Sequence, residues 1–306
     1  MYWLWHQYTS PKSDRDQIRF IIEPGATADQ VASRLVTSGV LESSWIFRLG
    51  ARFDALTLKI QSGEFLLNSG LSTREILHHF AFGKTLQRSL TVPEGLNKWE
   101  VVDLVNSSLG LTGTIDARNH SEGSLFPDIY FYSWGDTREK LIERMKTKMD
   151  RSIKKSWALR NKASVLQSPK ELVTLASIIE KEASLTSERS RISAVFNNRL
   201  KLGMRLQADP TVIYALTGGT RKLGRGLSRS DLRLRSPYNT YLIAGLPPGP
   251  ITNPGEVSLR AAAQPSNSTD LYFVSDGKGG HLFARTLDQH NINVARWRKL
   301  KRQKYR

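Results

Sequence analysis

The sequence predicts an α+β protein, with a small N-terminal domain followed by a larger, mixed but mainly helical domain that holds a short β-sheet. Near the N-terminus, a strand, a turn glycine and a helix start follow one another three times. Further along, apolar residues recur at helical spacing in several segments, and one segment has the pattern of a β-hairpin. A length of 306 residues, 39% hydrophobic and 24% charged, is enough for two globular domains.

The three N-terminal units share one design. An extended apolar run leads to a glycine, then to a Thr, Ser or Asn, and then to a Gln or Glu three residues further on. This spacing predicts a helix whose first turn is closed by a capping box, in which two side chains and two backbone N–H groups bond reciprocally. The glycine, N-cap and capping partner are Gly25, Thr27 and Gln30, then Gly70, Ser72 and Glu75, then Gly95, Asn97 and Glu100.

The middle of the chain is expected to hold a helix and polar loop from Pro93 to His120, and then the aromatic segment Ser121–Asp136. Aromatic residues interleaved with Gly, Pro and Asp suit a wall that stacks against sugars, and they suit a packed loop equally well. Thr137 to Leu159 predicts a long basic amphipathic helix, with a spacing typical of a core-facing stripe. Its apolar face is Leu141, Ile142, Met145 and Met149.

The clearest helix is expected from Ser168. Ser168 suits the N-cap, Pro169 suits the first helical position, and Glu171 occupies the capping-box position. The apolar residues that follow at helical spacing are Leu172, Leu175, Ala176, Ile179 and Ala183.

The C-terminal part predicts a second helix from Thr186 to Leu202, and a third that starts at Asp209, with Asp209 as N-cap before Pro210. Gly218–Arg229 is expected to be a basic loop, and the proline-rich Ser236–Gly255 a rigid, irregular wall. The remaining expectation is a hairpin from Leu271–Val274 and His281–Ala284, and a basic last helix from about Thr286. The many Lys and Arg residues of that helix are explained by a solvated tail, or by attraction to a membrane or to the cell wall.

Composition narrows the possible functions. There is no cysteine, so disulfides and thiolate metal sites are excluded, and the six histidines are scattered without metal-ligand spacing. No phosphate-binding glycine motif is present, and we expect no cofactor and no metal. The net charge of +17 favours a negatively charged partner, which can be nucleic acid, anionic lipid or peptidoglycan.

Two acids, Glu180 and Glu182, follow the apolar run of the Ser168 helix. A carboxyl against an apolar face has a raised pKa, which a general acid near neutral pH requires. The helical wheel places Glu182 between Leu175 and Ile178 and slightly favours it. Both acids are also explained as the solvated end of an amphipathic helix.

Several segments in one order carry a resemblance: LASIIEKEAS, VFNNRL, GMRLQADPTVIYAL, SPYNTY, GLPPGPITNPG and YFVSDGKGGHLF. They resemble the signature segments of the YceG-like endolytic murein transglycosylases, and the resemblance runs from about Ile21 to about Arg296. It implies a LysM-like domain over residues 18–90 and a catalytic domain over residues 91–306. It also implies a lyase that cleaves the MurNAc–GlcNAc β-1,4 bond and leaves 1,6-anhydroMurNAc ends.

The resemblance assigns the catalytic acid to Glu182, the second Glu of the E-K-E segment. It implies that six further residues line or support the substrate cleft, although Asp209 is equally explained as an N-cap. These residues are Asn198, Gln207, Asp209, Tyr238, Asn239 and Thr240. The implied partners are peptidoglycan strands, peptidoglycan synthases and an anionic membrane surface, and not nucleic acid.

Residues 1–17 are expected to be the stub of a membrane anchor or a loose terminus. Met1–Trp5 is far shorter than the roughly 20 apolar residues that span a bilayer. Relatives of this kind begin with one transmembrane helix, so the resemblance implies the periplasmic face of the inner membrane. We expect a missing upstream segment to supply the anchor.

Two other functions stay open from the sequence. One is a glycosidase that uses water and a second carboxylate, for which Asp209 and Glu180 are the candidates. The other is a basic protein that binds peptidoglycan or nucleic acid without cutting it. The intact E-K-E segment and the segments after it favour the lyase.

Overall fold

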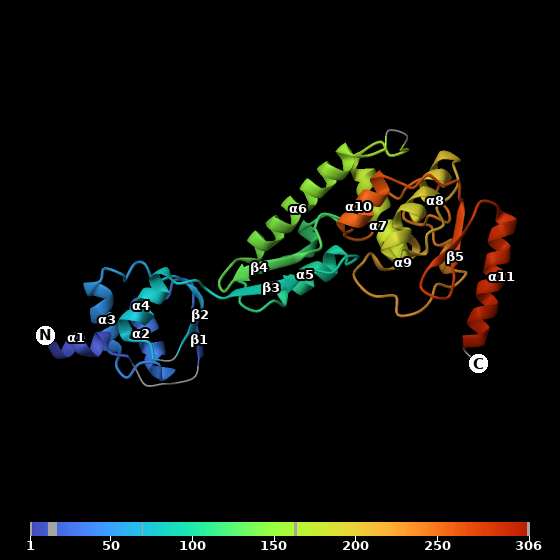
Figure 1. The fold of residues 1–306 in the computed structure, drawn as a ribbon. Helices are drawn as coiled ribbons and strands as arrows, with labels where there is room; N and C mark the ends of the chain where they lie inside the picture. The colour runs from blue at the N-terminus through green and yellow to red at the C-terminus, as the bar shows by residue number, and fades with distance from the viewer. Residues whose placement is uncertain (1, 12–16, 69, 162–163, 305–306) are drawn as a thin grey trace. The chain divides into compact units, whose positions relative to one another are not determined.

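A computed structural model describes residues 2–11, 17–68, 70–161 and 164–304. The chain forms two compact units. Unit 1 comprises residues 1–90, 107–114 and 130–141, and unit 2 comprises residues 91–106, 115–129 and 142–306. Helices dominate, and the sheets of the described residues are three two-stranded pairs (Figure 1). The expected mixed, mainly helical fold is thus confirmed.

Unit 1 is built on an antiparallel pair of strands, β1 (Ile18–Ile22) and β2 (Gly63–Leu67). Helices α1 (Tyr2–Thr9), α2 (Ala28–Thr37), α3 (Ser44–Phe53) and α4 (Thr73–Phe82) belong to the same unit. Phe20, Phe65 and Phe80 meet in its core. The ring centroid of Phe80 lies 5.0 Å from that of Phe65 and 5.4 Å from that of Phe20. Alternation along β1 supplies Phe20 and Ile22 to this core because successive strand residues face opposite sides.

The three capping boxes predicted for the strand–turn–helix segments are confirmed. At α2, Thr27 accepts from the N–H of Gln30, and Gln30 accepts from the N–H of Thr27. Ser72 and Glu75 do the same at α4. Asn97 and Glu100 do so at α5 (Lys98–Asn106). Each reciprocal pair satisfies backbone N–H groups that a helix start would otherwise leave unbonded.

The segment Ser121–Asp136 contains a strand that the sequence did not predict. Strand β4 (Ile129–Ser133) pairs with β3 (Gln87–Thr91). Tyr130 and Tyr132 are buried, whereas Phe131 is 57% exposed, so the side chains alternate as a half-buried strand requires. Gly and Pro residues around this segment interrupt the alternation of apolar and polar residues, so the strand could not be predicted from the sequence.

Within unit 1, α1 packs against α3 and α4. The Tyr8 ring covers Gly50, and the Tyr8 hydroxyl donates to Asp54 at 2.8 Å. Within the described residues, we find no helix with both the length and the apolar character needed to cross a bilayer.

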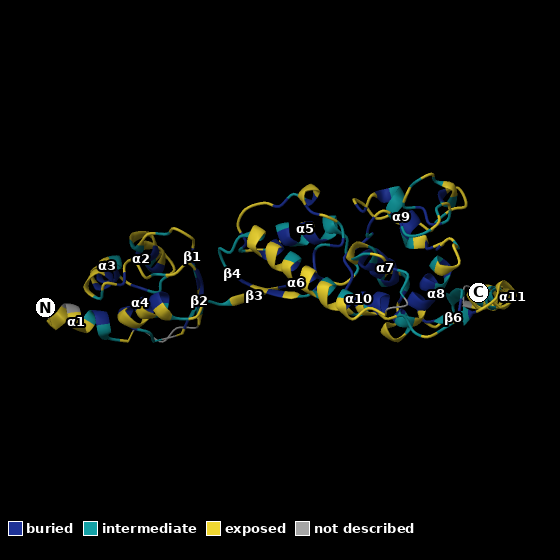
Figure 2. Cartoon of the chain, turned by 90° about the horizontal axis from the view of Figure 1, so that it is seen from above, coloured by how far each residue is buried: buried dark blue, intermediate teal, exposed yellow. Residues whose placement is uncertain are grey.

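Unit 2 holds most of the long helix α6 (Arg138–Ala158), whose buried Leu141, Ile142, Met145 and Met149 confirm the predicted apolar face. Many of its remaining positions are exposed, drawn in yellow in Figure 2. After α6 come α7 (Pro169–Glu182), the 3₁₀ turn η2 (Thr186–Glu188) and α8 (Arg189–Lys201). They are followed by α9 (Asp209–Thr217), η3 (Asp231–Arg233) and α10 (Glu256–Ala263). The predicted hairpin, β5 (Tyr272–Ser275) with β6 (His281–Ala284), and the last helix, α11 (Leu287–Lys304), are both present.

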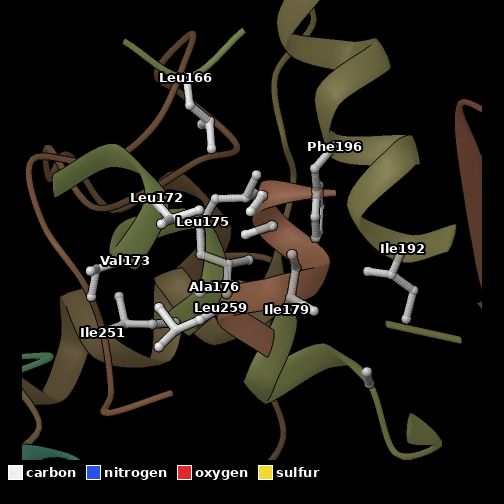
Figure 3. Packing of buried hydrophobic residues seen from close by; sticks show 14 of the residues in the cluster. Leu166, Leu172, Val173, Leu175, Ala176, Ile179, Ile192, Phe196, Ile251 and Leu259 are labelled. Atoms are coloured by element: carbon white, nitrogen blue, oxygen red, sulfur yellow. The ribbon is translucent and has the colours of Figure 1, made fainter. Parts of the chain in front are cut away.

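Helix α7 is the centre of unit 2. It contacts α8, α9 and α10, and Figure 1 shows it between α10 and α8. Its Leu172, Leu175 and Ile179 pack into a cluster with Leu259 of α10 and Phe196 of α8 (Figure 3). Residues 172–179 are all buried, so the central part of α7 is held by packing on several sides.

The start of α7 departs slightly from the predicted capping box. Ser168 is the N-cap and accepts from the N–H of Glu171, as expected. Glu171 instead accepts from the N–H of Gln167, one residue before the N-cap, at 2.7 Å. Helix α10 was not predicted at all, because its short run EVSLRAAA follows directly on the prolines of the irregular wall.

Candidate active site

Glu182 is the last residue of α7, where the chain leaves the helix through the extended Ala183. Protein atoms surround most of the carboxyl, while part of the residue keeps contact with solvent. Burial, and to a smaller extent the nearby negative charge of Asp209, raise the pKa of Glu182 to about 8. The carboxyl therefore holds its proton at neutral pH and can donate it.

Asp209 is exposed and begins α9, but the prediction that it is the N-cap is wrong. Ala208 holds the N-cap position, and no side chain caps this helix end. Asp209 is the first residue of the helix and Pro210 the second, and both positions in a first turn tolerate the missing N–H of a proline. Its Oδ1 atom accepts instead from the hydroxyl of Tyr241 at 2.6 Å.

Tyr241 bonds to Asp209 and lies within the electrostatic influence of Glu182. Burial raises the pKa of Tyr241 above its usual range, and the hydrogen bond to Asp209 and the charges of Asp209 and Glu182 raise it further. The phenol thus remains a neutral donor at any working pH. Glu182, Asp209 and Tyr241 form one electrostatically coupled group, which we call the acid cluster.

Gln207 lies next to this cluster in a strained conformation. Its φ of 52° is in the left-handed region that non-glycine residues rarely adopt, and the residue is exposed. The Gln207 N–H donates to the carbonyl of Thr240, and its Oε1 accepts from Arg199 at 3.4 Å. Such strain costs about 1–3 kcal/mol and is typical of functional sites, so these contacts have to fix the backbone here.

Thr240 and Asn239 are fully buried, so their side chains do not reach the surface. The Thr240 hydroxyl lies 2.8 Å from that of Thr211 and accepts from the N–H of Ala208, which joins this loop to the start of α9. The Asn239 amide donates to the carbonyls of Leu232 and Leu234. Their role is therefore to hold the loop in place.

Asn198 and Tyr238 have separate surroundings. The Asn198 amide donates to the carbonyls of Ser268 and Asp270, and so it fixes the segment before β5. The Tyr238 ring lies against that of Tyr214 on α9, with centroids 5.0 Å apart. Of the six residues expected at the cleft, Gln207 and Asp209 are exposed and Tyr238 is half-buried, whereas the amide of Asn198 is occupied by backbone carbonyls.

Glu180 has a structural environment. Its side chain is 3% exposed and pairs with Arg189 at 2.8 Å, and it also accepts from the N–H of Gly255 at 3.0 Å. Arg189 bonds in addition to Glu94 and to the hydroxyl of Ser258. Residues two positions apart in a helix are rotated by about 200° around the helix axis. Glu180 and Glu182 therefore point to different sides of α7.

Three residues near the site were not singled out from the sequence: Glu122, Tyr214 and Tyr241. Burial raises the pKa of Glu122 to about 7. Only their places within the segments SEGSLF, PTVIYAL and SPYNTY could have indicated them. Among the residues that the structure describes, no cluster of three or more His, Asp or Glu side chains is arranged to hold a metal ion.

Comparisons with known proteins connect this chain to a family. Residues 20–296 match the YceG-like family. The chain is 32% identical over 313 residues to a protein of Bacillus subtilis strain 168 named endolytic murein transglycosylase, covering 92% of this chain and 84% of that one. A protein of the same name from Streptococcus pneumoniae serotype 2 is 27% identical over 321 residues, and the match spans 90% of this chain and 57% of that protein.

A solved structure agrees. A crystal structure of a yceG-like protein of Listeria monocytogenes matches with a TM-score of 0.55 and 31% identity. The match covers 91% of this chain and 99% of that one.

Proposed function

The chain belongs to the YceG-like family, and from this premise we propose that it is an endolytic murein transglycosylase, a lyase that cuts peptidoglycan strands internally. The observation that carries the proposal is Glu182, an acid at the end of a rigid helix that keeps its proton at neutral pH. A lytic cut needs one such acid, because the nucleophile is a hydroxyl of the substrate itself.

In the proposed reaction, Glu182 gives its proton to the oxygen that links MurNAc C1 to GlcNAc C4. The C1–O bond breaks, and the GlcNAc side leaves with that oxygen as a hydroxyl. The Glu182 carboxylate then takes the proton from the C6 hydroxyl of MurNAc, whose oxygen closes on C1. The product is 1,6-anhydroMurNAc, and the acid ends as it began, with no water consumed.

The residues around Glu182 suit this sequence of proton transfers. Asp209 carries the charge that helps to keep Glu182 protonated before the cut. Tyr241 bonds to Asp209 and so fixes where that charge lies. Exposed Gln207 offers an amide to the sugar, while Tyr238 contributes an aromatic face. Asn239 and Thr240 hold the loop that carries Tyr238 and Tyr241, whereas Asn198 holds the segment before β5.

A hydrolase is the second candidate, because Asp209 lies close enough to influence the pKa of Glu182. In that case Asp209 would activate a water molecule, as the second carboxylate of ordinary glycosidases does. Its bond to the Tyr241 hydroxyl at 2.6 Å occupies one of its oxygens and favours the positioning role.

The proposal includes a place in the cell and partners. We propose that residues 18–90 act as a LysM-like glycan-binding domain, and that residues 91–306 make the cut beside peptidoglycan synthases. We place the protein at the periplasmic face of the inner membrane. On unit 1, Trp5, Trp45 and Phe53 are 44–79% exposed, close to Arg48, and such aromatic and basic surfaces suit an anionic membrane interface.

The test is the mass of the products. Purified peptidoglycan digested with the wild-type chain should give fragments that end in anhydromuramic acid, lighter by one water than reducing ends. Glu182→Gln keeps the shape of the side chain but has no proton to give, and the rate should fall by about 10²–10⁴-fold or more. Reducing ends in the wild-type digest would identify the hydrolase instead, with Asp209→Asn as the next variant.

A further inference from the structure

Another carboxyl of unit 2 with a raised pKa, that of the partly buried Glu122, plays no part in the chemistry above. Its Oε1 atom accepts from the N–H of Lys98, the first residue of α5, at 2.9 Å. Its Oε2 atom accepts from the hydroxyl of Tyr214 on α9 at 3.3 Å. The N–H of Gly123 is a third donor, and a carboxylate accepts about four bonds, so capacity for a further donor remains.

Glu122 completes the capping of α5, because it accepts from the Lys98 N–H that the capping box of Asn97 and Glu100 leaves unbonded. This bond uses its Oε1 atom, while its Oε2 atom has the Tyr214 hydroxyl as its donor. The Tyr214 bond is long for an O–H donor to a carboxylate, for which 2.5–2.7 Å is usual. Glu122 is only partly covered by protein, as are Tyr214 and Tyr238.

Aromatic side chains surround this carboxyl. Tyr238 lies against Tyr214, and the charge of Glu122 contributes to the raised pKa of both phenols. Trp99, Tyr214 and Asn97 converge on Gly219, where a Cβ atom would lie 3.2–3.4 Å from each of them. An acceptor beside half-exposed aromatic faces is suited to a sugar ring, which offers hydroxyl and amide donors at its edge and C–H groups on its face.

Three segments of unit 2 connect Glu122 and its aromatic neighbours to the acid cluster. Helix α9 carries both Asp209 and Tyr214, five residues or roughly 7.5 Å apart along its axis. The loop at 238–241 carries both Tyr238 and Tyr241. The turn before α5 lies on the end of α7, because Lys181 donates to the carbonyl of Gly95 at 3.2 Å.

We propose that Glu122, Tyr214 and Trp99 form a second sugar subsite, next to the acid cluster, in which Glu122 accepts a hydrogen bond from a hydroxyl or N-acetyl N–H of a neighbouring hexosamine ring. This inference rests on the proposed function and deepens it. Glu122 does not touch the bond that is cut, so it is a positioning residue. Its loss should therefore weaken binding and leave the chemical step nearly unchanged.

Ionisation of Glu122 should control this subsite. Burial raises the pKa of Glu122 to about 7. The opposing contributions, which lower the pKa, come from the backbone N–H groups of Lys98 and Gly123, the Tyr214 hydroxyl and the positive charge of Lys98. The Tyr238 phenol is the other titratable group that faces it. A carboxylate is a stronger acceptor than a carboxylic acid, so KM should fall as the pH rises through about 7.

The test compares Glu122→Gln with wild type in the full-length chain, on glycan strands freed of their peptides. Glu122→Gln should raise KM about 3- to 10-fold at pH 7.5, keep kcat within about twofold and abolish the change of KM with pH. Tyr214→Phe, which keeps the ring, should raise KM in the same direction. Glu256→Gln is the matched control, since it removes one carboxylate from a pair with Lys155 whose side chains are more than half exposed.

Binding without turnover separates the two levels of the proposal. In the Glu182→Gln background, adding Glu122→Gln should weaken calorimetric binding of the same strands by the same factor. Wild type that releases no glycan fragments contradicts the proposed function. Wild type that cuts strands, with an unchanged KM in both Glu122→Gln and Tyr214→Phe, contradicts the subsite alone. A fall in kcat that follows a fall in melting temperature would make Glu122 purely structural and would also overturn the subsite.

Discussion

Glu180 and Glu182 lie two residues apart on α7, and their carboxylates have opposite environments. Glu180 bonds to the Arg189 guanidinium and to the backbone N–H of Gly255. Glu182 has the charge of Asp209 nearby, and burial disfavours its ionised form. The helical wheel separated the two sides but could not show the partners, because Arg189 and Asp209 belong to other helices.

The raised pKa of Glu182 predicts how activity depends on pH. The acid must be protonated to start the cut, so kcat should fall as the pH rises through about 8. A kcat–pH profile on peptidoglycan, measured from pH 6 to pH 9.5, checks this. A rise in kcat across pH 7–9 would mean that Glu182 works as a base that must be ionised first.

The same shift also predicts an effect on stability. Because the pKa is higher in the folded chain than in the unfolded one, the folded state binds more protons between about pH 4.5 and 8, and stability falls with pH over that window. Glu182→Gln has no charge to bury, so its melting temperature should match wild type near pH 4.5 and exceed it at pH 8.5. A lower melting temperature at pH 8.5 would show that the carboxylate is well accommodated.

Glu180→Gln should act through the fold. It leaves Arg189 buried with only Glu94 as a charged partner, and breaking a buried pair typically costs about 3–5 kcal/mol. We expect a loss near the lower end of that range in urea unfolding, with most activity per folded molecule retained at low temperature. Glu256→Gln, in an exposed pair, should cost less than about 1 kcal/mol. Complete inactivity of a well-folded Glu180→Gln would place this residue in the chemistry.

At the scale of elements, the sequence predicted what short-range chemistry determines. The capping boxes at Thr27, Ser72 and Asn97 follow from residues three apart, and the apolar stripe of α6 from a repeat of 3.6. Strand β4 and helix α10 were missed because Gly and Pro next to them masked their periods. Asp209 was misplaced by one residue, a difference that only the backbone geometry decides.

The site shows the same division. Glu182 could be proposed as the catalytic acid from the apolar pattern of the helix that starts after Ser168 and from the resemblance to the YceG-like family. The contacts of Asp209 with Tyr241, and of Glu122 with Tyr214, join residues 32 and 92 positions apart in the chain. No local pattern encodes such pairs, because they depend on how α9 and the loops around it pack. The strained φ of Gln207 likewise follows from its bond to Thr240 and has no sequence signal.

At the scale of the whole molecule, two separate cores correspond to the two units. The core of unit 1 is formed by residues between Tyr8 and Ala81, and that of unit 2 by residues between Phe126 and Ala263. Each cluster draws on several helices, and a chain segment with its own core can fold by itself. The pairing of β3 with β4 complicates a cut at residue 90, because it would leave β3 without its partner strand.

The last prediction follows from this arrangement. A fragment of residues 1–86 keeps the whole core of unit 1 and ends before β3, so it should unfold cooperatively in urea as an independent domain. The complementary chain from residue 87 should keep its activity on short soluble glycans and lose several-fold more on intact sacculi, where a glycan-binding domain raises the local concentration of substrate. The full-length Glu182→Gln variant gives the background rate for the assay on short soluble glycans and for the assay on sacculi. Equal losses on the two substrates would mean that residues 1–86 support the catalytic unit directly, and the glycan-binding role would then fail even if the fragment folds.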